Sequence, residues 1–165
     1  MVIKGEAGMQ FMGDWAKGEF TAAGKEPGVS YIAAPAPGTS NMFLFNVDSF
    51  IMFTQKDAGA QEAQKAMARL ILQTEFQEVF NVNKGSIPVR VGMSEDPFDV
   101  PARDSMKAFL ATAESGGLVP SMAHEMAVFP AVRGAIMDVV TNFYNSDMSA
   151  KDAAAQLAKE VEAAM

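Results

Sequence analysis

The 165-residue sequence contains no cysteine, one histidine and one tryptophan. The absence of cysteine excludes disulfides, zinc–thiolate sites and cysteine nucleophiles. No Lys/Arg cluster offsets the net charge of -7, so the acidic balance argues against nucleic acid as a partner. No uninterrupted apolar run is long enough to span a bilayer. The first residues, Met1–Glu6, also lack the charged-then-apolar pattern of a secretory signal peptide.

The composition is that of a folded chain with a buried core. Hydrophobic residues make up 49% and charged residues 20% of the sequence, which argues against disorder. The length corresponds to one ordinary domain. The chain starts abruptly, one short apolar stretch before a motif, and we expect either a cut end or an added Met1.

Strand signals are concentrated in the first third of the sequence. Short apolar stretches predict strands at 8–12, near Tyr31–Ala33 and over 42–53. Asp14 stands at a helix start, where its carboxylate can cap a helix running to Phe20.

The remainder of the sequence predicts helices. Asp57 can cap a helix over 58–73 whose apolar face carries Ala63, Met67, Leu70 and Ile71. Thr74 to Gln77 has capping-box spacing and opens a second helix, which Asn83-Lys-Gly-Ser-Ile-Pro88 breaks. Further helices are expected at 101–114, stopped by Gly116-Gly117, at about 121–145 with a kink or restart at Pro130, and from a Ser149 cap to about 163.

Four segments, in order, resemble extracellular solute-binding proteins of ABC sugar importers, with the glucose/mannose-type branch the most similar. The first segment, Lys4–Gly18, resembles the "G-x-A-A-M-x-x-x-G-x-W" pattern of that family. The other three are Phe45-Asn-Val-Asp-Ser49, Asn83-Lys-Gly-Ser-Ile-Pro-Val-Arg90 and Ser121-Met-Ala-His-Glu125, the last of which is expected to open the long helix. Each motif alone is weak, whereas the ordered set is specific and extends over nearly the whole chain.

The resemblance implies an α/β, periplasmic-binding-protein-like (type II) fold. In that family two lobes close over a sugar, and residues 1–165 resemble only the C-terminal portion, predominantly helical with a few strands. It also implies a periplasmic location, an ABC permease as partner, and a cleft whose opposite wall lies in an N-terminal portion absent from this sequence.

Four residues are candidate sugar contacts. On residue type alone, Trp15 is better explained as a core residue, and Lys84 as an exposed lysine at a helix end. Asp48 is as easily a turn or capping residue, and a lone histidine such as His124 is more often a satisfied surface residue. The resemblance instead implies that Trp15 stacks on the sugar ring, while the other three hydrogen-bond its hydroxyls.

The resemblance thus implies a non-enzymatic protein that binds a monosaccharide, a glucose-like hexose, and uses no cofactor or metal. Asn46 and Arg90 are possible supporting residues. Ser121 and His124 lie three apart without an evident acid, which is a poor basis for a hydrolase. The alternative is a truncated interaction module that self-associates, because apolar surface shaped to face a missing lobe must be covered by the missing portion or a second copy.

Overall fold

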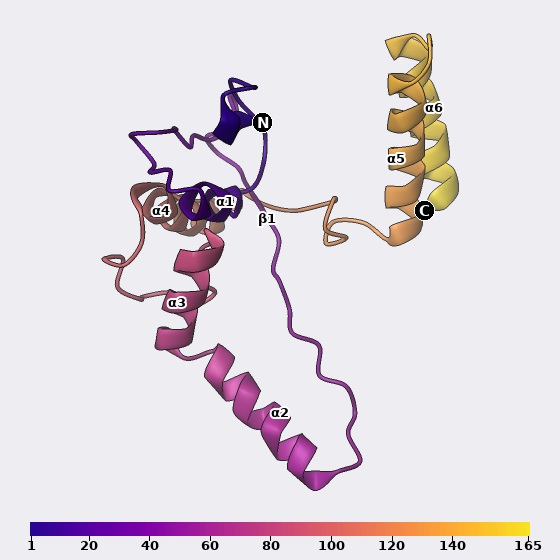
Figure 1. The fold of residues 1–165 in the computed structure, drawn as a ribbon. Helices are drawn as coiled ribbons and strands as arrows, with labels where there is room; N and C mark the ends of the chain where they lie inside the picture. The colour runs from indigo at the N-terminus through magenta and orange to yellow at the C-terminus, as the bar shows by residue number, and fades with distance from the viewer. The chain divides into compact units, whose positions relative to one another are not determined.

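The structure, a computed structural model, describes all residues 1–165 and is mostly helical (Figure 1). Its two strands are parallel and hydrogen-bonded to each other. Along the chain the elements are η1 (Val2–Lys4), α1 (Ala16–Ala22), β1 (Phe43–Phe45), α2 (Ala58–Ile71), α3 (Thr74–Lys84), α4 (Val100–Ser115), β2 (Leu118–Pro120), α5 (Pro130–Tyr144) and α6 (Ala150–Ala164).

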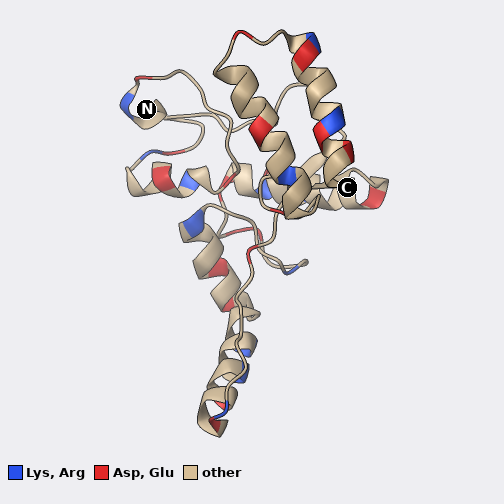
Figure 2. Ribbon diagram, turned by 90° about the vertical axis from the view of Figure 1, so that its right-hand side faces the viewer, with Lys and Arg blue, Asp and Glu red and all other residues tan.

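The chain forms two compact units. The first comprises Met1–Phe43 and Ser49–Gly117, and the second comprises Leu44–Asp48 and Leu118–Met165. The first unit therefore contains α1 to α4, and the second contains the α5–α6 pair, which runs side by side in Figure 1. Basic and acidic residues are interspersed along the helices (Figure 2). None of the helices combines the length and apolar character needed to cross a membrane.

Helix ends set by local chemistry match the sequence prediction. The Asp57 carboxylate accepts a hydrogen bond from the Ala60 N–H at 2.8 Å, and the Ser149 hydroxyl accepts one from the Asp152 N–H at 3.1 Å. At the other ends of α3 and α4, Gly85 and Gly116 adopt φ 85° and 77°. This left-handed conformation suits glycine and ends a helix cleanly. The boundaries of α2, α3, α4 and α6 are confirmed within a few residues.

Two predictions about helix starts are wrong. Neither α1 nor α3 has a side-chain cap, and their N-caps are Trp15 and Gln73 rather than Asp14 and Thr74. Gln77, the expected partner in the capping box, instead donates to the Ile71 carbonyl at 2.8 Å.

The long helix expected over 121–145 is also wrong in its first third. Residues 121–129 form turns, and α5 begins only at Pro130. Phe129 has ψ 151°, the extended conformation that a following proline favours, so Pro130 starts a helix rather than kinking one.

Most of the expected strands are absent. Residues 8–12 form no strand, Tyr31 makes only an isolated bridge with Pro27, and the stretch over 42–53 is a strand only at Phe43–Phe45. A strand exists only where a neighbour accepts its backbone hydrogen bonds. Here β2 supplies that neighbour for three residues alone.

Each unit has a small core. In the first unit Phe20, Phe98 and Ala102 are buried; in the second, Val132 and Val139 of α5 lie buried with Ala153 of α6.

The apolar face predicted for α2 remains exposed. No residue of α2 is buried, and the side chains of Met67 and Leu70 are 41% and 50% exposed. The helix itself is confirmed, but its apolar stripe has no covering element in the first unit.

Candidate functional site

The first candidate contact, Trp15, lies at the N-cap of α1 and is half-buried. Its indole ring folds back over Gly13, where any Cβ would collide with the ring. The same indole lines a pocket of about 330 Å³ together with Gln10, Glu19, Phe20 and residues 1–3. This volume is at the lower end of the range for small-molecule sites. Trp15 is therefore neither fully in the core nor fully on the surface.

The second candidate, Lys84, ends α3, and its contacts are aromatic and electrostatic. Its Nζ lies 5.5 Å from the centroid of the Phe80 ring, a cation–π distance. Phe80 in turn stacks on Phe76 with 5.6 Å between ring centroids. The Phe80 ring of α3 thus faces the ammonium of Lys84.

Asp14 interacts electrostatically with both lysines of this region. Burial raises the pKa of the Asp14 carboxyl above its usual range, and the nearby charges of Lys17 and Lys84 oppose the rise. Asp14 thus links the start of α1 electrostatically to the end of α3.

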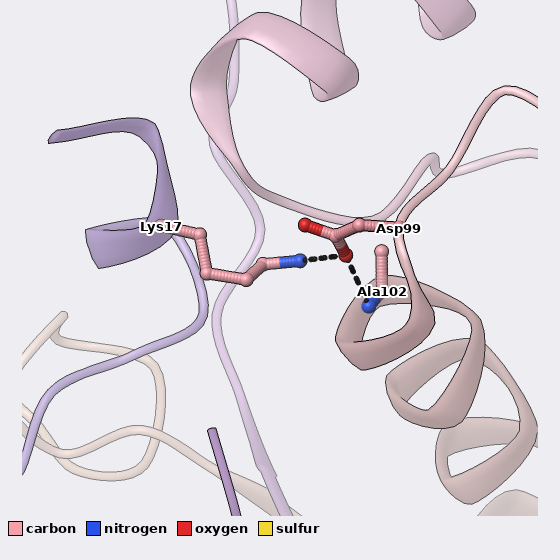
Figure 3. A network of polar contacts seen from close by, with 3 residues as sticks. All are labelled: Lys17, Asp99 and Ala102. Carbon is pink, nitrogen blue, oxygen red and sulfur yellow. Dashed lines mark hydrogen bonds and ion pairs between the residues drawn. The ribbon is translucent and has the colours of Figure 1, made fainter. Parts of the chain in front are cut away.

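Lys17 and Asp99 join α1 to α4 (Figure 3). The Lys17 side chain is 5% exposed, and its Nζ lies 2.8 Å from Asp99 Oδ1. The same oxygen accepts the backbone N–H of Ala102 at 2.7 Å and so caps α4. Neither residue was predicted from the sequence. Asp99 directly before Val100-Pro101 has the pattern of an N-cap, but nothing in the sequence pairs it with a lysine 82 positions away.

The other two candidates lie in the second unit, on segments joined by backbone contacts. The Ser121 N–H donates to the Phe45 carbonyl at 2.8 Å, and the Val47 N–H lies 3.3 Å from the sulfur of Met126. Residues 45–48 and 121–126 therefore lie side by side.

Asp48 follows β1 and is exposed, so the strand predicted over 42–53 does not include it. The Asn46 side-chain amide donates to its Oδ1 at 3.3 Å. Arg90, the other possible supporting residue, donates to the Leu72 carbonyl at 2.8 Å and links the loop after α3 to the end of α2.

His124 lies in a turn and not on a helix, contrary to the prediction for Ser121–Glu125. Its Nδ1 is 2.7 Å from the hydroxyl of Ser121, a buried residue. Glu125 adopts φ 60°, which is unfavourable for a residue other than glycine and prevents a continuous helix here. Glu125 also pairs with Arg133 at 2.9 Å, which ties the turn to α5.

The structure thus places Trp15 and Lys84 in the first unit, and Asp48 and His124 in the second. Within each unit the two candidates lie on neighbouring segments. No group of three or more His, Asp or Glu side chains is placed to hold a metal ion.

Comparison with known proteins finds relatives whose names describe related kinds of binding protein. No protein-family model matches the chain. A "probable sugar-binding periplasmic protein" of Brucella suis biovar 1 is 44% identical over 164 residues, which are 99% of this chain and 39% of the relative. A protein of the same name from Rhizobium meliloti is 42% identical with the same coverage. An "uncharacterized ABC transporter extracellular-binding protein" of Pyrococcus horikoshii is 37% identical over 88% of this chain and 32% of its own length.

The chain therefore spans about two fifths of the length of the curated relatives it matches first. The names of these relatives describe binding proteins and not enzymes. The chain is homologous to part of a group of probable sugar-binding periplasmic and ABC extracellular-binding proteins.

Proposed function

We propose that this chain contributes part of the cleft of a periplasmic protein that binds a monosaccharide, a glucose-like hexose, for an ABC permease. The observation that carries the proposal is the 44% identity, over 99% of the chain, to a protein named as sugar-binding. The proposed fold is the periplasmic-binding-protein-like (type II) arrangement. Since the relatives are longer, the proposal assigns the rest of the cleft to a portion outside these 165 residues.

The four candidate contacts supply the chemistry that a pyranose requires. The half-exposed indole of Trp15 offers a flat apolar face for the C–H side of the ring. Asp48 can accept from two hydroxyls, and Lys84 can donate to others. The Ser121 hydroxyl holds Nδ1 of His124, so the proposal assigns the other ring nitrogen, Nε2, to a sugar hydroxyl. The hydrogen bonds of the Asp48 carboxylate and the Lys84 ammonium would be charge-assisted, and such bonds are stronger than those between neutral groups.

A second candidate function is self-association, and the uncovered face of α2 favours it. Met67 and Leu70 are exposed next to Leu72, which is 54% exposed. Sedimentation velocity of the 165-residue chain tests this candidate. A dimer that dissociates when Met67 and Leu70 are replaced by glutamine would support it, and a monomer at all concentrations would reject it.

The test of the sugar-binding proposal is a hybrid protein in which this chain replaces the matching 164 residues of the Brucella suis relative. Calorimetry with a panel of hexoses then measures affinity. Asp48→Asn, Lys84→Met and His124→Ala should each weaken binding about 10- to 100-fold, because each removes a hydrogen bond with a charged or polar group. Trp15→Ala should weaken it at least as much, since it removes the stacking face.

Matched control variants show whether a loss of sugar affinity comes from the proposed site or from any substitution of the same type. Asp147→Asn, Lys159→Met and Tyr144→Ala change the same kinds of side chain at exposed positions outside the proposed site. These variants should bind like the unmodified hybrid. If the folded hybrid binds no mono- or disaccharide, or if the controls weaken binding as much as the site variants, the proposal fails.

A further inference from the structure

The start of α1 and the end of α3 meet backbone to backbone. A Cβ built on Gly18 would lie 2.6 Å from the carbonyl oxygen of Lys84 and 3.1 Å from that of Asn83. A Cβ on Gly85 would lie 2.6 Å from the backbone nitrogen of Gly18. Real Cβ atoms essentially never approach other atoms within 3.0 Å, so any larger residue at either position must push the helices apart.

The two glycines adjoin the two candidate sugar contacts of the first unit. Trp15 is three residues, about one helical turn, before Gly18, and Lys84 directly precedes Gly85. The helix crossing therefore sets how far the backbone of Trp15 lies from the backbone of Lys84. Because glycine has no side chain, the two backbones themselves are in contact at the crossing.

The surrounding contacts hold this crossing in place. Lys17, whose Cβ is 3.1 Å from the position a Gly85 Cβ would take, is tied to Asp99 at 2.8 Å. The carboxyl group of Asp14, at the start of α1, interacts electrostatically with both Lys17 and Lys84. The Trp15 ring is itself folded over Gly13, which limits the positions open to it.

We propose that Gly18 and Gly85 are positioning residues that hold the backbones of Trp15 and Lys84 close enough for both side chains to contact one sugar ring. This inference rests on the proposed function. Gly18 acts only by lacking a Cβ and so allowing the close approach, because its backbone conformation is ordinary helix. Gly85 acts in two ways: it also lacks a Cβ at the close approach, and it adopts a φ of 85°, which other residues rarely adopt.

The chain contains a matched control for each glycine. Gly134, in the middle of α5, is a helical glycine with nothing within 4 Å of a built Cβ. Gly116 caps α4 with φ 77° and also has open space around it. Gly134→Ala and Gly116→Ala therefore repeat the backbone change of Gly18→Ala and Gly85→Ala without the collision.

The first experiment measures the separation itself, without sugar. Because the chain has no cysteine and one tryptophan, Lys84→Cys labelled with bimane has a single cysteine-bound dye and a single quencher, Trp15. Adding Gly18→Ala should reduce the quenching of bimane by Trp15, and adding Gly134→Ala should not. Unchanged quenching in a folded Gly18→Ala protein would overturn the proposal.

The second experiment measures hexose affinity in the hybrid protein with Lys84 intact. Gly18→Ala and Gly85→Ala should weaken binding about tenfold or more, while Gly134→Ala and Gly116→Ala should stay within about twofold of the unmodified hybrid. If the unmodified hybrid binds no sugar, the proposed function fails and bimane quenching alone decides the positioning role. If it binds and the Gly18 and Gly85 variants bind equally well, only the positioning role fails.

Circular dichroism separates misplacement from unfolding. If the Gly18→Ala variant loses its helical signal, both experiments are done with the Gly85→Asn variant instead, since asparagine tolerates a positive φ. Loss of helix in both variants, with Gly116→Asn still folded, would show that the crossing serves folding only and would reject the positioning role.

Discussion

Replacing Asp99 by alanine tests whether the Lys17–Asp99 pair holds α1 to α4. The change leaves the buried ammonium of Lys17 without its 2.8 Å partner and removes the cap on the Ala102 N–H. Removing one partner of a buried pair costs about 3 to 5 kcal/mol, and losing an N-cap costs about 1 kcal/mol. Asp99 is 31% exposed, and Asp14 still attracts Lys17. These two features reduce the cost of losing the pair to about 2 kcal/mol, so we expect Asp99→Ala to lower the free energy of unfolding by about 3 kcal/mol in total.

A double-mutant cycle separates the two contributions. Lys17→Met should cost about 1 kcal/mol or less, because an apolar side chain of similar length replaces the buried charge and Asp99 keeps its cap. Lys17→Met with Asp99→Ala should cost only about 1 kcal/mol more than Lys17→Met, the value of the cap. The pair would then show a coupling of about 2 kcal/mol.

Urea unfolding followed by Trp15 fluorescence measures these differences, because Trp15 lies two residues from Lys17 and reports on the first unit. Asp99→Ala should lower the unfolding midpoint by about 1 to 3 M urea. Asp99→Asn serves as the control, since it retains a capping oxygen and should fall between wild type and Asp99→Ala. An Asp99→Ala protein within 1 kcal/mol of wild type, or a double variant no more stable than Asp99→Ala, would refute the reasoning.

Three further predictions use single substitutions. Because burial raises the pKa of Asp14, its stabilising contribution is present at low pH and lost as the pH rises through the folded-state pKa. Asp14→Asn should therefore be more stable than wild type in urea at pH 7 and equal to it near pH 3; a constant difference would contradict this. Asp57→Ala should weaken α2 by about 1 kcal/mol and speed amide exchange in Ala58–Ile71 alone, since that helix buries nothing; slowed or global exchange would contradict it. Gly134→Ala should raise stability by about 0.5 to 1 kcal/mol in thermal unfolding, and a loss would show hidden crowding in α5.

The parts of the fold that follow from neighbouring residues could be predicted. Asp57 and Ser149 cap helices, and Gly85 and Gly116 end them, because each acts on backbone groups within a few residues. Strands could not be predicted in this way. The apolar run over 42–53 has the composition of a strand, but only the three residues that β2 reaches pair with it.

The turn at Ser121–Phe129 shows how a helical pattern can mislead. Its apolar spacing continues that of α5, so sequence periodicity joins the two. The actual conformation depends on Pro130, on the positive φ of Glu125 and on the Ser121 N–H pairing with Phe45. The last of these contacts joins two residues, Ser121 and Phe45, that are far apart in the sequence.

The candidate site shows the same division. Residue types and order were sufficient to nominate Trp15, Asp48, Lys84 and His124, which stay predictions until binding is measured. The contacts around them were not accessible in advance. Lys17 pairs with a residue 82 positions away, and the approach of Gly18 to Gly85 depends on two helices separated by the whole of α2.

The interleaved make-up of the two units also fixes the order in which they can be completed during synthesis. The first unit has all its residues once Gly117 has left the ribosome, whereas the second requires the chain up to its C-terminal helix. Leu44–Asp48, which carries one candidate contact, emerges early but belongs to the unit that is finished last. Since domains generally fold in the order of their synthesis, we expect this segment to remain unpaired until β2 has been synthesised.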